Sequence, residues 1–97
     1  MTETKRTVKR TAPFKREYKK AMKQGKDISL LLKLIEMLAN DEPLPEKHRD
    51  HALVGDWKVY RECHVTPDWL LVYSKDEESG ELLLILTRLA NHNTLRF

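Results

Sequence analysis

Five side chains in the sequence have the chemistry of an acid–base site that handles a phosphate group. They are His51, His64, Asp68, Arg88 and His92. Histidine titrates near neutral pH and can give or take a proton, and a carboxylate can act as a base or orient an imidazole. Arginine binds phosphoryl oxygens through its planar guanidinium group. These residue types therefore suit proton transfer next to a phosphate.

RNA is a substrate class that such a site could cleave, because RNA supplies its own nucleophile. Cleavage through the 2′-hydroxyl needs a base for the hydroxyl proton, an acid for the departing 5′-oxygen, and a cation for the charge that develops on the phosphate. The residue types match these three needs. They also occur in most chains of this length, so the match indicates a chemistry and does not by itself establish a function.

Zinc binding is the alternative use for His48 and His51. A helical segment would place both on one face, but structural zinc takes four ligands that usually include cysteines. Cys63 is the only cysteine, and Pro43 and Pro45 disfavour a rigid helix just before the pair. We therefore expect no metal ion and no other cofactor. We also expect His48 to be solvated and Cys63 to be buried and unreactive.

Positive charge is concentrated at the start of the chain. Residues 1–26 contain ten Lys or Arg and two acidic residues, whereas the rest contains eight Lys or Arg and thirteen acidic residues. This asymmetry indicates an anionic partner, with nucleic acid or the ribosome first, although a solvated helix face explains the same charges. Lys15 and Lys19 are candidate contacts to such a partner.

The 97 residues are expected to form a single domain over 1–97, with a flexible N-terminus over 1–5. The basic N-terminal segment has no apolar core of the kind found in secretory signals. The apolar runs are too short to span a membrane. We therefore expect a cytoplasmic protein without a membrane partner.

Hydrophobic periodicity predicts two helices and a sheet, which is an α+β fold. Pro13 suits the first turn of a helix that ends near Gly25, and Asp27 suits the N-cap of a second helix that ends near Asn40. A short edge strand is expected over 6–11. The second helix is apolar over a wide arc, either because it is sandwiched between the first helix and the sheet or because a partner protein covers part of it.

Three strand-like runs follow the proline-containing loop, over 57–65, 69–75 and 81–89. They predict a small antiparallel sheet on which the helical hairpin packs, with a polar loop over 76–80. Trp57 is expected in the core, whereas Trp69 could be a core residue or a surface on which a base stacks.

The segment 50–73 carries a resemblance to a known family. Its sequence is DHALVGDWKVYRECHVTPDWLLVY, and an Arg-x-x-x-His pattern follows at Arg88 and His92. These motifs resemble the YafQ branch of the RelE/ParE toxin superfamily, and the resemblance extends over nearly everything from Pro13 onward.

The resemblance implies a RelE-like fold and the toxin of a type II toxin–antitoxin system, a ribosome-dependent endoribonuclease that cuts mRNA. The implied partners are the 70S ribosome, mRNA and a DinJ- or RelB-like antitoxin. His51, His64, Asp68 and His92 match the family's acid–base and substrate-contacting residues, and Arg88 matches its charge-stabilising arginine. Our hypothesis is that His92 is the general acid and that Asp68 or His64 is the base.

Five further residues are expected to contact the substrate: Arg61, Trp69 and Phe97, with Lys15 and Lys19 of the basic helix. Similar family members place a phenylalanine four residues after the last histidine. In this chain that position is Arg96, and Phe97 follows it.

Two other functions fit the sequence. A ParE-type toxin resembles RelE proteins in fold but inhibits DNA gyrase and cleaves no RNA. A non-catalytic RNA-binding module would use the basic helix alone. Loss of toxicity on His92→Ala, or new ends in messenger RNA, would separate a nuclease from both.

Overall fold

The computed structural model describes residues 4–55 and 59–91. The sequence expectations on Trp57, His92 and Phe97 fall outside these residues, as do residues 1–3 of the expected flexible N-terminus. The elements along the chain are β1 (Thr7–Arg10), α1 (Ala12–Lys23), α2 (Ile28–Ala39), the short 3-10 helix η1 (Glu46–His48), β2 (His51–Ala52), β3 (Arg61–Thr66), β4 (Trp69–Glu78) and β5 (Glu81–Ala90).

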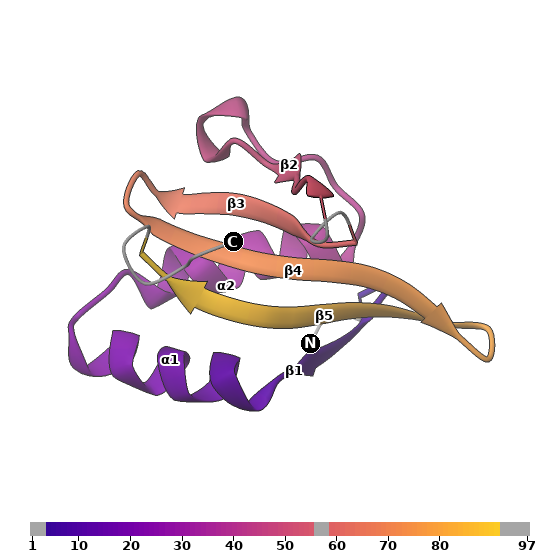
Figure 1. Ribbon diagram of the computed structural model, residues 1–97, viewed down its shortest axis with the longest axis horizontal. Coiled ribbons are helices and arrows are strands. Elements are labelled where there is room, and N and C mark those ends of the chain that lie inside the picture. Colours follow the sequence, from indigo (N-terminus) through magenta and orange to yellow (C-terminus); the bar gives the residue numbers. More distant parts are fainter. Residues whose placement is uncertain (1–3, 56–58, 92–97) are drawn as a thin grey trace.

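The five strands form one sheet in the order β1-β5-β4-β3-β2, and α1 and α2 pack on it (Figure 1). The predicted α+β fold is confirmed. The sheet is mixed, however, and not wholly antiparallel, because β1 pairs parallel to β5 while the other neighbours are antiparallel. Both helices and three strands separate β1 from β5 along the chain, so no tight turn dictates an antiparallel pairing.

Local capping sets the start of each helix. The Thr11 side chain accepts a hydrogen bond from the Phe14 backbone N–H at 3.2 Å, and Pro13 occupies the first turn of α1. Asp27 caps α2 by accepting from the Leu30 N–H at 3.1 Å. Both helices therefore begin within a residue or two of their predicted positions.

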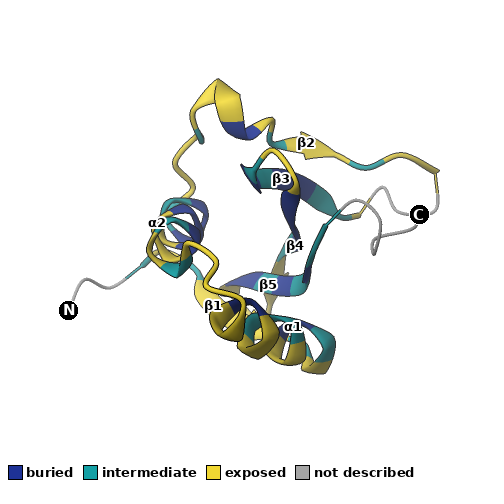
Figure 2. Cartoon of the chain, turned by 90° about the vertical axis from the view of Figure 1, so that its left-hand side faces the viewer, coloured by how far each residue is buried: buried dark blue, intermediate teal, exposed yellow. Residues whose placement is uncertain are grey.

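The main core lies between the two helices and one face of the sheet. Figure 2 shows α1 and α2 on the same side of the sheet, with buried residues along β3, β4 and β5. Phe14 and Ala21 come from α1. Their main partners from α2 and the sheet are Leu31, Leu34, Leu38, Cys63, Trp69, Leu71, Tyr73, Leu84, Leu86 and Leu89. The core thus fixes the sheet face that the helices cover and leaves the opposite face for other contacts.

Only part of the apolar arc of α2 is buried. Leu31, Leu34 and Leu38 are covered by the core, but Leu32 keeps half of its surface exposed. Leu32 lines a groove with Val8 and Tyr18, where α2, β1 and α1 meet. Burial against the sheet therefore accounts for most of the apolar positions on α2, but not for all of them.

A β-bulge in β5 decides which way its last residues point. Val72 pairs with Arg88, but the next residue of β4, Tyr73, pairs with Leu86, so Thr87 is the additional residue. The bulge lets both Leu86 and Leu89 reach the main core. It also moves Arg88 away from the core-facing positions.

α1 covers the edge of β5 beyond its pairing with β1. The Thr11 backbone N–H donates to the Leu86 carbonyl oxygen at 3.1 Å, and the Thr11 hydroxyl donates to the Thr87 carbonyl oxygen at 2.7 Å. The Leu89 N–H donates to Glu17 at 2.9 Å. These contacts satisfy backbone groups that an open sheet edge would leave unpaired.

The hairpin between β4 and β5 is tighter than expected. Only Ser79 and Gly80 separate the strands, and their φ angles of 50° and 83° suit the short turns that match strand twist. The strands therefore extend into the predicted 76–80 loop. β2 was expected to be loop, and β3 begins at Arg61. No helix among the described residues has the length and apolar character to cross a membrane.

Candidate active site

Three polar side chains meet on the sheet face that the helices do not cover. His51 of β2 lies opposite Glu62 of β3, and Glu62 and His64 point to the same side because strand residues two apart share a face. His51 Nε2 lies 3.5 Å from Glu62 Oε1, and His64 Nε2 lies 4.0 Å from the same oxygen. The two imidazole centroids are 6.4 Å apart. We call these residues the His–Glu–His cluster.

The other ring nitrogen of each histidine contacts a backbone carbonyl. His51 Nδ1 lies 2.6 Å from the Arg49 oxygen, and His64 Nδ1 lies 3.3 Å from the Pro67 oxygen. A carbonyl can only accept a hydrogen bond, so Nδ1 carries the hydrogen in both rings. Nε2 is therefore the nitrogen at which each ring can gain or lose a proton, and it faces Glu62.

His48 holds the loop before β2 against β3. It is buried, with 4% of its surface exposed, and its Nδ1 donates to the His64 carbonyl oxygen at 2.7 Å. The expectation that His48 is solvated was wrong. Pro45 and the turn of η1 carry this side chain inward, so it acts as a tether between the loop and the strand of His64.

A second network fixes the residue before His51. The buried Tyr73 hydroxyl donates to Asp50 Oδ1, and Arg61 Nε lies 3.3 Å from both the Asp50 carboxylate and the Tyr73 hydroxyl oxygen. Burial, together with the hydrogen bond to Asp50, raises the pKa of Tyr73 above its usual value. Burial also acts to lower the pKa of Arg61, but its contacts with Tyr73 and Asp50 outweigh this and raise it. The network therefore keeps Tyr73 neutral and Arg61 charged.

Arg88 is held by a carboxylate of α1. Its Nε donates to Glu17 Oε1 at 3.0 Å and its Nη2 donates to Oε2 at 2.8 Å. These hydrogen bonds outweigh the effect of burial and raise the pKa of Arg88. About a third of the side chain, 37%, remains exposed. Arg88 is thus a permanent, oriented cation at the edge of the sheet.

Comparison with known proteins identifies the family. Residues 6–96 match the family described as the bacterial toxin of type II toxin–antitoxin systems, YafQ. This chain belongs to the YafQ family. The mRNA interferase toxin YafQ of Escherichia coli K12 is 36% identical over 91 residues, which is 93% of this chain and 95% of that protein.

Solved structures agree with this assignment. YafQ in the crystal structure of the E. coli DinJ-YafQ toxin-antitoxin complex matches with a TM-score of 0.83 at 35% identity, covering 96% of this chain and 99% of that chain. YafQ from E. coli BL21(DE3) matches with a TM-score of 0.83 at 34% identity, covering 95% and 99%. The resemblance inferred from the sequence is confirmed.

The structure brings some of the YafQ-like site residues together and separates others. His51 and His64 share the His–Glu–His cluster. Asp68 is exposed in the turn between β3 and β4, two residues before the partner of His64 in the sheet. Arg88 lies across β4, where it pairs with Val72. His92 and Phe97 lie outside the described residues.

The expected substrate contacts are more dispersed. Lys15 and Lys19 are exposed on α1, which packs against the other face of the sheet. Arg61 pairs with the core residue Tyr73, so it points away from Glu62 and His64. Trp69 has 3% of its surface exposed and belongs to the main core, so its ring faces are not available for stacking. Only the edge of its indole reaches a cavity.

Glu62 is the site residue that the sequence reasoning missed. Its side chain is buried to 10% exposure between two histidines. The alternation of the YafQ motif offered a signal, because Glu62 and His64 are two residues apart in a predicted strand. The position of His51 opposite Glu62 depends on β2, which was not expected.

The described residues hold no group of three or more His, Cys, Asp or Glu side chains that could bind a metal ion. His48 and His51, the pair considered for zinc, each use Nδ1 in a hydrogen bond to a carbonyl. Cys63 is fully buried, and burial raises the pKa of its thiol to about 12.

Proposed function

We propose that this chain is an mRNA interferase that cuts messenger RNA on the ribosome through the RNA's own 2′-hydroxyl. The main observation in support is the His–Glu–His cluster. In it, two imidazoles present Nε2 to one carboxylate on the face of the sheet that the helices do not cover. The E. coli relatives named mRNA interferase toxin YafQ support the proposal.

The chemistry divides among the named residues. His64 or Asp68 takes the proton of the 2′-hydroxyl, and the 2′-oxygen then attacks phosphorus. The 5′-oxygen leaves with a proton from His92, which gives a 2′,3′-cyclic phosphate and a 5′-hydroxyl end. Arg88 stabilises the charge on the phosphoryl oxygens. His51 contacts the RNA, and Glu62 keeps the rings of His51 and His64 oriented.

The ribosome supplies what the site lacks. The described residues bring together few acid–base groups, so we infer that another surface holds the mRNA in a reactive geometry. The exposed Lys15 and Lys19 on α1 are suited to phosphates of ribosomal RNA, which would position the toxin without sequence specificity. Cleavage of free RNA is therefore expected to be weak.

A DinJ- or RelB-like antitoxin is the proposed protein partner, and the cytoplasm, where translating ribosomes are found, is the proposed location. The E. coli DinJ-YafQ complexes support this partner. The groove at Val8, Tyr18 and Leu32 is apolar apart from Arg10, which suits an amphipathic segment that carries an acidic residue.

The test is to add the purified chain to translating ribosomes and map new 5′-hydroxyl ends in the mRNA. We expect cuts with the wild-type chain and their loss with His64→Ala and His92→Ala. Lys33→Ala is the matched control, because Lys33 is exposed on α2 and far along the chain from the site. Absence of new ends with the wild-type chain would refute the nuclease and leave a gyrase poison or a binding module.

A further inference from the structure

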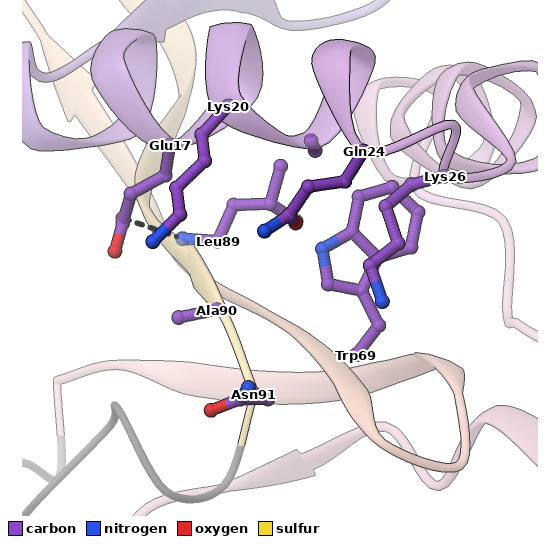
Figure 3. A pocket seen from close by; sticks show the side chains of 9 residues that line it. Glu17, Lys20, Gln24, Lys26, Trp69, Leu89, Ala90 and Asn91 are labelled. Atoms are coloured by element: carbon purple, nitrogen blue, oxygen red, sulfur yellow. Dashed lines mark hydrogen bonds between the residues drawn. The ribbon is translucent and has the colours of Figure 1, made fainter.

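A second site lies beside the proposed catalytic residues, under α1. A cavity of about 260 Å³ opens between the C-terminal half of α1 and the end of the sheet where β4 begins and β5 ends. Figure 3 shows Lys20 of α1 and the C-cap residue Gln24 on one side, Lys26 beside them, and Trp69 with the end of β5 opposite. The cavity is distinct from the His–Glu–His cluster.

Trp69 contributes to this cavity an N–H donor that has no protein partner among the described residues. The residue is 97% buried, since its exposed fraction is 3%. No residue in 4–55 or 59–91 accepts a hydrogen bond from its indole N–H. Every buried side-chain nitrogen in these residues has a partner, so the indole N–H must be accessible to solvent. In Figure 3 the indole nitrogen points into the cavity, toward the space between Gln24 and Ala90. A buried tryptophan N–H normally finds an acceptor, and here a ligand can supply one.

The rest of the lining is rich in donors. The ammonium groups of Lys20 and Lys26 extend into the cavity, and neither forms an ion pair with a described residue. The Gln24 amide offers two N–H groups and one oxygen. The one carboxylate, Glu17, is already engaged by Arg88 and by the Leu89 N–H. The cavity is therefore suited to an anion that carries hydrogen-bond acceptors.

We propose that this cavity binds one nucleotide of the RNA next to the cleaved bond and reads its base. Lys20 and Lys26 hold the phosphate, and the Trp69 N–H and the Gln24 amide pair with the edge of the base. A nucleotide is a ligand of about drug size, and the cavity of about 260 Å³ lies just below the roughly 300–1,000 Å³ of pockets that bury such ligands. The inference rests on the proposed function and assigns it a specificity subsite.

The position along the chain supports the assignment. Asp68 directly precedes Trp69, and Arg88 directly precedes Leu89, so each proposed catalytic residue is followed by a residue that lines the cavity. An RNA strand whose phosphate contacts Arg88 needs only to pass the end of β5 to place the next nucleotide under α1.

The first test uses the isolated full chain and NMR. The indole N–H signal of Trp69, assigned with Trp69→Phe, is followed during titration with AMP, GMP, CMP, UMP and inorganic phosphate. We expect at least one nucleotide to shift this signal saturably, and phosphate alone to leave it in place. No shift with any nucleotide, or an equal shift with phosphate, would overturn the proposal.

The second test maps cleavage ends on translating ribosomes with Gln24→Ala and Trp69→Phe, with Lys33→Ala as control. We expect the preference for one base beside the cut to fall about three- to tenfold in the first two variants, the effect of one lost hydrogen bond. Gln24 is the exposed C-cap residue of α1, so Gln24→Ala still tests the proposal if Trp69→Phe does not fold.

The outcomes separate this inference from the proposed function. If the wild-type chain makes no cuts, the proposed function fails while the titration still decides whether the cavity binds a nucleotide. If the wild-type chain cuts and the variants keep its base preference, only the subsite fails. Weaker antitoxin binding by Gln24→Ala with unchanged base preference would assign the cavity to the protein partner and overturn the proposal.

Discussion

Glu17 and Arg88 lie 71 residues apart in the sequence and hold each other through two parallel hydrogen bonds, at 3.0 and 2.8 Å. The same carboxylate accepts the backbone N–H of Leu89 at 2.9 Å. One side chain of α1 therefore fixes both the guanidinium and the strand that carries it. The Nη1 group of Arg88 takes no part in these two hydrogen bonds and can donate to a phosphate oxygen.

Glu17→Gln is expected to slow mRNA cleavage by about 10- to 100-fold, because a misplaced catalytic group costs rate even when the fold is intact. The Gln oxygen can still accept from the Leu89 N–H, but its amide nitrogen cannot accept from Arg88. Single-turnover cleavage on ribosomes is the measurement. We expect the rate at saturating toxin to fall while the concentration for half-maximal rate is unchanged.

Glu36→Gln, an exposed position on α2, provides the charge-matched control for Glu17→Gln. Rescue of cleavage by Glu17→Asp would show that Arg88 needs a carboxylate at this position. An unchanged rate in Glu17→Gln would show that Arg88 does not need this partner.

Tyr73→Phe should weaken both stability and cleavage. The buried hydroxyl donates to Asp50 and contacts Arg61. Its removal leaves the half-buried Asp50 carboxylate, 22% exposed, with one partner fewer, which costs about 1 kcal/mol. Because Asp50 directly precedes His51, the imidazole loses its fixed position. Urea unfolding and the cleavage rate are the two measurements.

Tyr18→Phe is the control for Tyr73→Phe, since the Tyr18 hydroxyl makes no hydrogen bond to a described residue. It should leave the unfolding midpoint nearly unchanged. Equal stability of the two variants would contradict the role of the Tyr73 network.

The sequence was a good guide to the elements because their local signals are strong. Thr11, Pro13 and Asp27 mark the helix starts, and alternating apolar residues mark β3, β4 and β5. The parallel direction of β1 could not be predicted from the sequence, because strand pairing between distant segments depends on the packing of the whole core. The same holds for the contact between Glu17 and Arg88.

The bulge at Thr87 shows why the site was harder to predict than the fold. Strict alternation from Leu84 and Leu86 would have turned Arg88 into the core. The additional residue, Thr87, reverses the alternation of side chains along β5. No local sequence motif predicts this bulge. His48 was expected to be solvated because it is a polar residue in a proline-containing loop. Its burial depends on the hydrogen bond to the His64 carbonyl, which is distant in the sequence.

Cys63 is expected to resist thiol reagents in the folded protein. It is fully buried, and burial raises the pKa of the thiol to about 12, so the reactive thiolate is absent at pH 8. Labelling should be about 1,000-fold or more slower in buffer than in urea, because only the rare unfolded state reacts. The chain has one cysteine, so the label reports on this site alone. Rapid labelling in buffer would contradict the burial of β3.

Asp41→Asn should destabilise the protein at neutral pH and have little effect in acid. Arg6 Nε and Lys75 Nζ both donate to Asp41 Oδ1, at 2.7 and 2.8 Å. The hydrogen bond from Arg6, followed by that from Lys75, lowers the pKa of Asp41 below 3.8. The folded state therefore binds this proton less readily than the unfolded state, so the stabilisation is present above pH 3.8 and disappears as the pH falls through the lowered pKa.

For two partly exposed ion pairs the expected loss at pH 7 is about 0.5–1 kcal/mol, which lowers the melting temperature by several degrees. Asparagine tolerates the left-handed backbone at this position, where φ is 58°, so the substitution tests the charge and not the turn. Glu42→Gln, the exposed neighbour, is the control. Thermal unfolding is measured from pH 7 to pH 3. The melting temperatures of the wild type and Asp41→Asn should converge as the pH falls, because protonation of Asp41 removes the same charge that the substitution removes. A constant difference across this range would assign the effect to the amide itself and contradict the ion pairs.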